Sequence, residues 1–168
     1  MVRSFFGSNR SGKTTAGAVE TAIHTTGVYP DWYPMERRYS HCVKGRILAQ
    51  DFKKAIGEVI TDALDTWIPK KSILDKQKNQ QGIYDKYWIK HSSGGISTFD
   101  IVTYEQKSEV CEGWSGDFAW YDEPPPRSHR IATVRGLTDR FGFEIFTLTP
   151  LKEAYLFDEI YTPGTKLC

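Results

Sequence analysis

The sequence has few cysteines, almost no net charge and no long apolar run. Its three cysteines, Cys42, Cys111 and Cys168, form no C-x-x-C pair, which excludes a disulfide framework and a zinc site of the usual spacing. No run approaches the ~18 apolar residues of a membrane span, and no stretch resembles a signal peptide. The 22 basic and 21 acidic residues leave a net charge of +1, so any contact with DNA must be local. We expect a soluble, intracellular protein of a reducing compartment that contacts no membrane.

The remaining composition is that of a globular domain. Hydrophobic residues make up 39% and aromatic residues 14% of the 168 residues, which excludes a disordered or collagen-like chain. This length suffices for one α/β domain with a buried core and is too short for two ordinary domains. We therefore expect residues 1–168 to form a single domain.

Short apolar runs and helical periodicity alternate along the chain. The apolar runs predict strands at residues 2–6, 44–50, 83–91, 96–104, 118–121 and 144–149. Apolar residues at helical spacing predict helices over 13–26, 51–67 and 128–135. Asp51 is the expected N-cap of the second helix, and Gly136 is the expected end of the third. Residues 27–43 and the lysine-rich residues 70–81 are predicted to be surface loops, although the lysines also suit contact with nucleic-acid phosphates.

The loop between the first strand and the first helix matches the pattern G-x-x-x-x-G-K-[ST] at every constrained position. Glycines let the backbone wrap closely around a polyphosphate, so that N–H groups and the helix N-terminus meet the phosphate oxygens. Lys13 is expected to bind the β and γ phosphates of ATP, and Thr14 is expected to ligate Mg²⁺. The alternative is a glycine-rich turn that binds no nucleotide. The predicted nucleotide-binding residues are Gly7, Ser8, Asn9, Arg10, Ser11, Gly12, Lys13, Thr14 and Thr15.

Two adjacent carboxylates, Asp122 and Glu123, end the apolar run at residues 118–121. Consecutive residues at a strand end point to opposite sides, so Asp122 is expected to approach the metal while Glu123 polarises an attacking water. This division suits a Mg²⁺-dependent ATP hydrolase better than a kinase, because a kinase must keep water out of its site. The alternative is an acidic pair at a solvated turn. Pro124 to Pro126 are expected to end the strand and to fix the carboxylates.

A threonine-containing strand end forms the third element. The run Ile145-Phe146-Thr147-Leu148-Thr149-Pro150 places Thr147 and Thr149 at the end of a predicted buried strand. Beside a nucleotide, such a hydroxyl can hydrogen-bond the catalytic water or the γ-phosphate and register its loss. The alternative is an ordinary β-branched strand end stopped by proline.

These residues resemble the large terminase subunit of tailed bacteriophages, the ATP-driven motor that pumps DNA into a preformed capsid. The resemblance covers nearly all of the chain, in matching order and spacing. The phosphate loop alone is shared by a very large superfamily, whereas the Asp-Glu-Pro-Pro run followed by Leu-Thr-Pro is far more specific. The stretches that carry the resemblance are Gly7 to Thr15, His24 to Trp32, Trp120 to Pro125 and Leu148 to Leu151.

The resemblance implies an ASCE-type P-loop ATPase, a three-layer α/β fold with a central, mainly parallel sheet flanked by helices. Lys13 and Thr14 would bind nucleotide and Mg²⁺, Asp122 would be the Walker B metal ligand, and Glu123 would be the catalytic glutamate. Residues 147–150 would match the motif that couples hydrolysis to subdomain motion.

The resemblance also implies partners: double-stranded DNA, the portal protein, and a small terminase subunit that selects the DNA. It implies a ring of copies on the portal, a monomer in dilute solution, and action in the host-cell cytoplasm at the procapsid. Full-length family members carry an upstream adenine-binding segment and a downstream nuclease domain. The 168 residues leave room for neither, so we expect a fragment that holds the ATPase domain alone.

The chain departs from the family at the arginine that precedes the acidic strand in many members. The matching neighbourhood here reads Glu112-Gly113, so an arginine that reaches the γ-phosphate must come from elsewhere. Arg10, inside the phosphate loop, is the first candidate and is expected to have a sensing or bridging role in catalysis, with a solvent-facing loop arginine as the alternative. The other candidates, for which an ordinary surface charge is the favoured interpretation, are Arg127, Arg130, Arg135 and Arg140.

The sequence leaves two other functions open. A small-molecule or nucleotide kinase would transfer phosphate to an acceptor and would not need Glu123. A nucleotide-binding module that is inactive in isolation would keep the phosphate loop without turnover. Trp114 and Trp120 are expected to be packing residues, and the four histidines (His24, His41, His91 and His129) are expected to be structural, since none has metal-ligand spacing.

Overall fold

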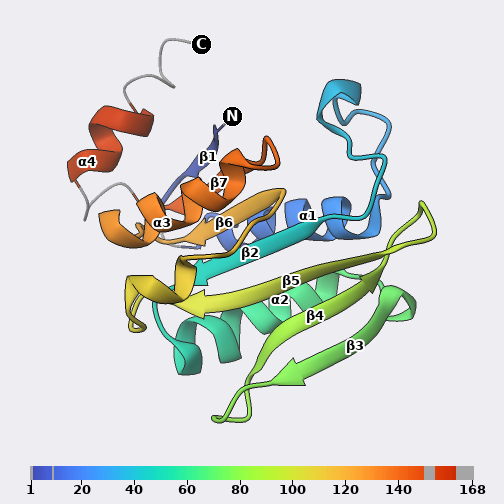
Figure 1. Cartoon of the computed structure of the whole chain (residues 1–168), viewed down its shortest axis with the longest axis horizontal. Coiled ribbons are helices and arrows are strands. Elements are labelled where there is room, and N and C mark those ends of the chain that lie inside the picture. Colours follow the sequence, from blue (N-terminus) through green and yellow to red (C-terminus); the bar gives the residue numbers. More distant parts are fainter. Residues whose placement is uncertain (1, 9, 150–153, 162–168) are drawn as a thin grey trace.

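The computed structural model describes residues 2–8, 10–149 and 154–161, which form a central sheet with helices on both faces (Figure 1). The strands are β1 (Val2–Phe6), β2 (Lys44–Ala49), β3 (Ile73–Lys78), β4 (Tyr84–Lys90), β5 (Ile96–Thr103), β6 (Phe118–Asp122) and β7 (Phe143–Leu148). The α-helices are α1 (Lys13–Thr26), α2 (Thr61–Trp67), α3 (Arg127–Thr138) and α4 (Ala154–Leu156). The π-helical segments are η2 (Phe52–Ile60) and η5 (Phe157–Tyr161), and the 3₁₀ turns are η1 (Met35–Arg37), η3 (Lys70–Ser72) and η4 (Ser108–Cys111). Among the described helices, none is long and apolar enough to cross a membrane.

Within the described residues, the sheet has seven strands in the order β1-β7-β6-β2-β5-β4-β3. The neighbouring strands in the series β1-β7-β6-β2-β5 are all parallel to each other. Strand β4 pairs antiparallel with both β5 and β3. Strand β7 lies between the strand that precedes the phosphate loop, β1, and the strand that ends in the acidic pair, β6. The predicted fold class, a mainly parallel sheet flanked by helices, is therefore confirmed.

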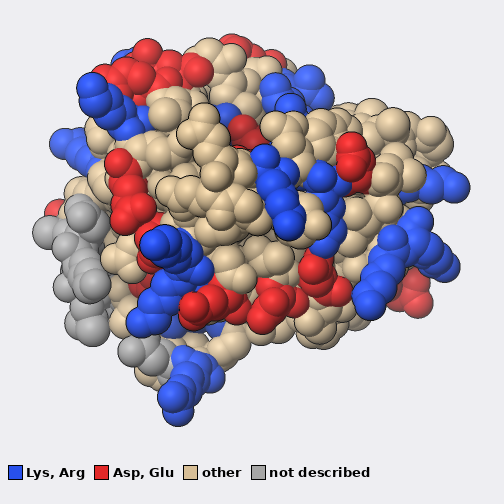
Figure 2. All heavy atoms as spheres, turned by 90° about the horizontal axis from the view of Figure 1, so that it is seen from below, with Lys and Arg blue, Asp and Glu red and all other residues tan. Residues whose placement is uncertain are grey.

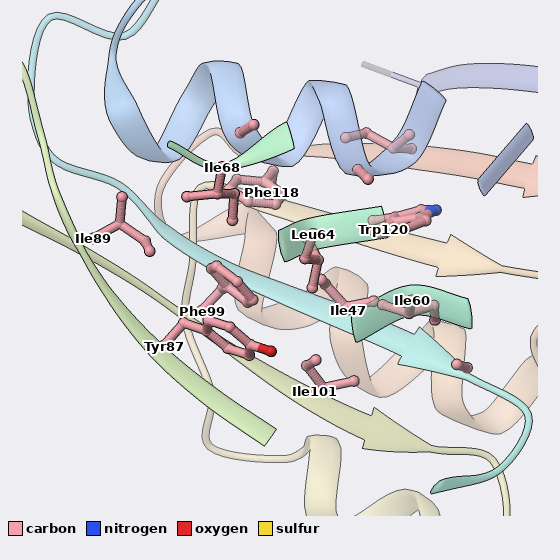
Figure 3. Packing of buried hydrophobic residues seen from close by; sticks show 14 of the residues in the cluster. Ile47, Ile60, Leu64, Ile68, Tyr87, Ile89, Phe99, Ile101, Phe118 and Trp120 are labelled. Atoms are coloured by element: carbon pink, nitrogen blue, oxygen red, sulfur yellow. The ribbon is translucent and has the colours of Figure 1, made fainter. Parts of the chain in front are cut away.

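The sheet separates two apolar layers. Helices α1 and α2 and segment η2 cover one face, and α3, η4 and the segment at 154–161 cover the other. On the first face, Trp120 of β6 is completely buried beneath α1, and the Tyr87 and Phe99 rings stack with centroids 4.5 Å apart (Figure 3). A Cβ at Gly17 of α1 would lie 2.1 Å from the Trp120 ring. Only glycine permits this close approach, which sets the distance between α1 and the strand that carries the acidic pair.

Most of the elements expected from the sequence are present. Asp51 caps the helix that follows β2, since its carboxylate accepts hydrogen bonds from the N–H groups of Lys54 (2.6 Å) and Ala55 (3.4 Å). The helical stretch ends at Trp67 as predicted, but its first part is a π-helix, and Val59 and Trp67 are 46% and 48% exposed. The turn at residues 92–95 joins β4 and β5, the strands predicted at 83–91 and 96–104, in an antiparallel hairpin.

Two predictions about local structure are wrong. The lysine-rich residues 70–81 contain strand β3, which pairs with β4, because tertiary pairing outweighs the polarity of an edge strand. Helix α3 does not stop at Gly136 but continues to Thr138. Gly136 is there for packing, since a Cβ would lie 2.0 Å from the Trp114 carbonyl oxygen. Trp114 and Trp120 are both buried packing residues, as expected.

A buried polar cluster holds α1 against the loop at residues 27–43. The Glu20 carboxylate accepts hydrogen bonds from Arg3 (2.6 Å) and from the Tyr33 hydroxyl (2.8 Å), and the His24 ring lies 3.2 Å from it. The other ring nitrogen of His24 lies 3.1 Å from the Tyr29 hydroxyl. This histidine is therefore structural, as predicted, and anchors the tyrosine-rich loop.

Candidate active site

The phosphate loop joins β1 to α1 and is held in an unusual backbone conformation. Gly12 caps α1 with φ 83°, and Arg10 has φ 64°, which is uncommon for a residue with a side chain. A Cβ at Gly7 would lie 2.4 Å from the Ser11 Oγ, so this glycine lets the loop close on itself. Glycine is therefore required at Gly12 by its positive φ and at Gly7 by the close approach of Ser11. Asn9, also predicted to bind nucleotide, lies outside the described residues.

Lys13, the first residue of α1, points back across the loop. Its ammonium donates hydrogen bonds to the backbone carbonyl oxygens of Gly7 (3.0 Å) and Ser8 (2.8 Å). This brings a full positive charge to the N-terminus of α1, where backbone N–H groups and the helix dipole also favour an anion. The described part of the loop thus has the charge and the donors that a polyphosphate requires.

A chain of hydrogen bonds runs from the loop into the sheet. The Asp122 carboxylate accepts a hydrogen bond from the Thr14 hydroxyl (3.1 Å) and one from the Thr147 hydroxyl (2.8 Å). The Thr147 oxygen in turn accepts from the Trp120 indole N–H (2.7 Å). Burial raises the pKa of the Asp122 carboxyl to about 6, although both hydroxyl donors oppose the rise. Thr147 is completely buried and contacts Asp122 without lining the cavity.

Glu123 leaves the strand in a left-handed conformation, with φ 67°. Its N–H donates to the Thr147 carbonyl (3.0 Å), and its carboxylate accepts from the Thr149 N–H (3.4 Å). The prediction that Asp122 and Glu123 point to opposite sides as consecutive strand residues is therefore wrong, because β6 ends at Asp122 and the backbone turns there. Both carboxylates instead line one cavity. The Thr149 hydroxyl is buried and has no hydrogen-bond partner among the described residues, and Pro150 lies outside them.

The cavity has a volume of about 620 Å³ and is open to solvent. It is lined by both the phosphate loop and the Asp122–Glu123 pair, which are far apart in the chain. Its walls are formed by the following residues: Arg10, Ser11, Gly12, Lys13, Thr14, Thr15, Gln50, Asp51, Lys54, Ala55, Val59, Asp122 and Glu123.

The wall at residues 50–59 was missed by the sequence reasoning. It consists of Gln50 and Asp51, which follow β2, and of Lys54, Ala55 and Val59 of η2, and it lines the same cavity as the phosphate loop. The sequence signal that could have indicated this wall is the polar pair at the end of a predicted buried strand, since ligands bind at the carboxyl ends of parallel strands. That β2 lies next to β6 is set by tertiary pairing. Gln50 and Asp51 follow β2 directly, as Glu123 follows β6.

The five candidate arginines differ in their surroundings. Arg130 is paired with Glu144 and Glu159, Arg140 with Asp117, and Arg127 more loosely with Glu159. The side chains of Arg10 and Arg135 have no hydrogen bond or ion pair to any described residue, and of these two only Arg10 lines the cavity with the acidic pair.

Three comparisons place the chain among known proteins. Residues 4–163 match the family model described as the terminase large subunit, T4likevirus-type, N-terminal. The large terminase subunit of Salmonella phage P22 is 29% identical over 180 aligned positions, covering 89% of this chain and 36% of that protein. The large terminase of a thermophilic bacteriophage, solved in complex with ADP, superposes with a TM-score of 0.66 at 14% identity, covering 99% of this chain and 38% of that one. The chain thus spans little more than a third of either relative. Because the family model matches nearly its whole length, the chain belongs to the family of N-terminal domains of T4likevirus-type large terminase subunits.

Proposed function

We propose that this chain is the ATP-hydrolysing domain of a viral DNA-packaging motor. One observation carries the proposal: the phosphate loop and the two carboxylates of β6 line the same cavity. Family membership supports the motor, and the ADP in the structure of the thermophilic-phage relative supports a nucleotide as the ligand of this fold.

The residues of the cavity suggest how hydrolysis proceeds. Lys13, Arg10 and the N–H groups at the start of α1 hold the phosphates and meet the negative charge that shifts toward the leaving group. The Glu123 carboxylate takes a proton from water as the water oxygen bonds to the γ-phosphorus. The bond between this phosphorus and the bridging oxygen breaks, which releases ADP and phosphate.

The site also suits a magnesium ion. The Thr14 hydroxyl and the Asp122 carboxylate are hard oxygen donors 3.1 Å apart on the cavity wall. Mg²⁺ is usually held by one or two such protein oxygens together with phosphates and water. Among the described residues no cluster of three or more His, Cys, Asp or Glu side chains is arranged to hold a metal, which fits a metal that arrives with its nucleotide. When bound, the ion neutralises charge on the phosphates.

The hydrogen-bond chain below the cavity supports coupling of hydrolysis to motion. Thr147 contacts the proposed metal ligand Asp122, and Thr149 contacts the proposed base Glu123. Thr147 lies in β7 and Thr149 follows Leu148, the last residue of that strand, so a change in either carboxylate on hydrolysis acts on the same end of β7. We infer that this strand end transmits the nucleotide state to the chain beyond it.

The proposed partners are double-stranded DNA, the portal protein, the small terminase subunit and further copies of this chain in a ring on the portal. The site of action would be the host cytoplasm. The surface charge supports a weak, local grip on DNA: seen from below the view of Figure 1, basic and acidic side chains are interspersed and form no continuous basic band (Figure 2).

Nucleotide binding to the full chain tests the proposal. Lys13→Ala should weaken ATP binding at least 10-fold in calorimetry, because it removes the charge at the loop. Lys70→Ala, which removes a lysine of η3 outside the cavity, is the matched control and should leave the affinity unchanged. Equal affinity of Lys13→Ala and the unaltered chain would refute the site. Phosphate passed to an acceptor instead of water would favour the kinase.

A further inference from the structure

Glu123 holds a conformation that its residue type does not favour. Among the described residues, only three other than glycine have positive φ: Arg10, Glu123 and Phe141. A left-handed conformation is strained for a residue that carries a side chain, so the surroundings must hold it in place. The N–H of Glu123 is bonded to β7, which fixes one side of the residue. The carboxylate is also contacted by the Thr149 N–H at 3.4 Å, so the group that fixes the carbonyl side of Glu123 completes the set of contacts that orient it.

Tyr104 supplies that group. Its hydroxyl lies 3.0 Å from the Glu123 carbonyl oxygen and 3.2 Å from the Leu48 carbonyl oxygen. Its own N–H donates to the Ala49 carbonyl at 2.9 Å. Tyr104 follows β5, so it joins the carboxyl end of β2 to the first residue beyond β6, on the face of the sheet that packs against α3.

The tyrosine is itself held on both sides. Its ring meets the His129 ring of α3 edge-on, with centroids 5.8 Å apart. The His129 ring nitrogen lies 2.8 Å from the Gln106 carbonyl, and the Gln106 side chain accepts from the Thr103 N–H at 2.9 Å. The turn that carries Tyr104 is thus fixed to α3 and to the end of β5. A side chain so restrained can impose a conformation on its neighbour.

We propose that Tyr104 is a positioning residue for Glu123: its hydroxyl fixes the Glu123 carbonyl and thereby aims the carboxylate at the attacking water. The inference rests on the proposed ATP hydrolysis. Tyr104 does not line the cavity and acts only through Glu123. Its hydroxyl should therefore affect the chemical step and leave nucleotide binding unchanged.

Tyr104→Phe removes the hydroxyl and keeps the ring. In the full chain, we expect kcat for ATP hydrolysis to fall at least 10-fold while the Kd for ATP stays within 2-fold. Tyr87→Phe is the matched control, because Tyr87 is buried in β4 beneath η2 and α2, away from the cavity. It should change neither quantity. An unchanged kcat in Tyr104→Phe, or a parallel loss of ATP affinity, would overturn the proposal.

A double-mutant cycle separates positioning from a general structural effect. If Tyr104 acts only through Glu123, adding Tyr104→Phe to Glu123→Gln should lower the residual rate no further. A further 10-fold loss would contradict the proposal. A crystal structure of Tyr104→Phe gives a test that needs no turnover: Glu123 should leave its positive φ, and retention of that φ would refute the positioning role even if the chain proved not to hydrolyse ATP.

Discussion

Thr147→Val tests whether the buried hydrogen-bond chain supports the site. Valine has nearly the same shape as threonine but cannot accept from the Trp120 N–H or donate to Asp122. An unpaired buried N–H costs about 1–3 kcal/mol, and loss of a bond to a carboxylate costs about 1.5–3 kcal/mol. The extra apolar burial offsets about 1 kcal/mol of this. We expect the free energy of unfolding to fall by about 3 kcal/mol, which corresponds to a Tm lower by roughly 6–12 °C for a chain of this size.

Urea unfolding followed by circular dichroism measures this difference. Thr147→Ser is the matched control, since it keeps the hydroxyl and loses one methyl group; its loss should be about 1 kcal/mol. If Thr147→Val lowered the free energy of unfolding by less than Thr147→Ser does, the hydrogen bonds of the Thr147 hydroxyl with Trp120 and Asp122 would not stabilise the fold.

Three further outcomes follow. Gly17→Ala should destabilise the chain by about 2 kcal/mol in urea unfolding, because the new Cβ meets the Trp120 ring; a gain of about 1 kcal/mol, as helix propensity alone predicts, would contradict the packing. Burial lowers the pKa of His24 below 6.5 despite the nearby Glu20, so its folded form resists protonation. The stability that this neutral histidine contributes is fully present above pH 6.5 and is lost as the pH falls toward its folded pKa, so Tm should be lower at pH 5.5 than at pH 7.5, and the drop should shrink in His24→Gln. DNA binding should be independent of sequence and should weaken at least 10-fold between 50 and 200 mM salt, measured by fluorescence anisotropy; salt-insensitive, sequence-selective binding would show base readout instead.

The phosphate loop and the positions of the main strands along the chain could be predicted because they depend on local signals. The loop has a fixed pattern, and the runs at residues 2–6 and 44–50 are apolar enough to indicate buried strands. Strand β3 was missed because its polar residues give no such pattern; it exists by pairing with β4. The length of α3 was missed because Gly136, which is typical of a helix end, is needed for its contact with Trp114.

In the candidate site, too, local sequence patterns could be recognised while features set by tertiary contacts could not. Adjacent carboxylates after an apolar run mark the end of β6, but the positive φ of Glu123 depends on contacts with β7 and with Tyr104, which are distant in sequence. The wall at residues 50–59 depends on the pairing of β2 with β6. The residues with a motif were found from sequence, and those placed by tertiary contacts were not.

The rate of phosphate release by Glu123→Gln decides whether Glu123 is the general base of ATP hydrolysis. Glutamine keeps the size of the side chain and cannot accept the proton of the attacking water. With ATP affinity measured on the same sample by calorimetry, we expect binding to be retained and kcat to fall at least 100-fold, the range typical of a lost general base. Unchanged turnover with intact binding would contradict the assignment of Glu123 and, with it, the proposed hydrolytic mechanism.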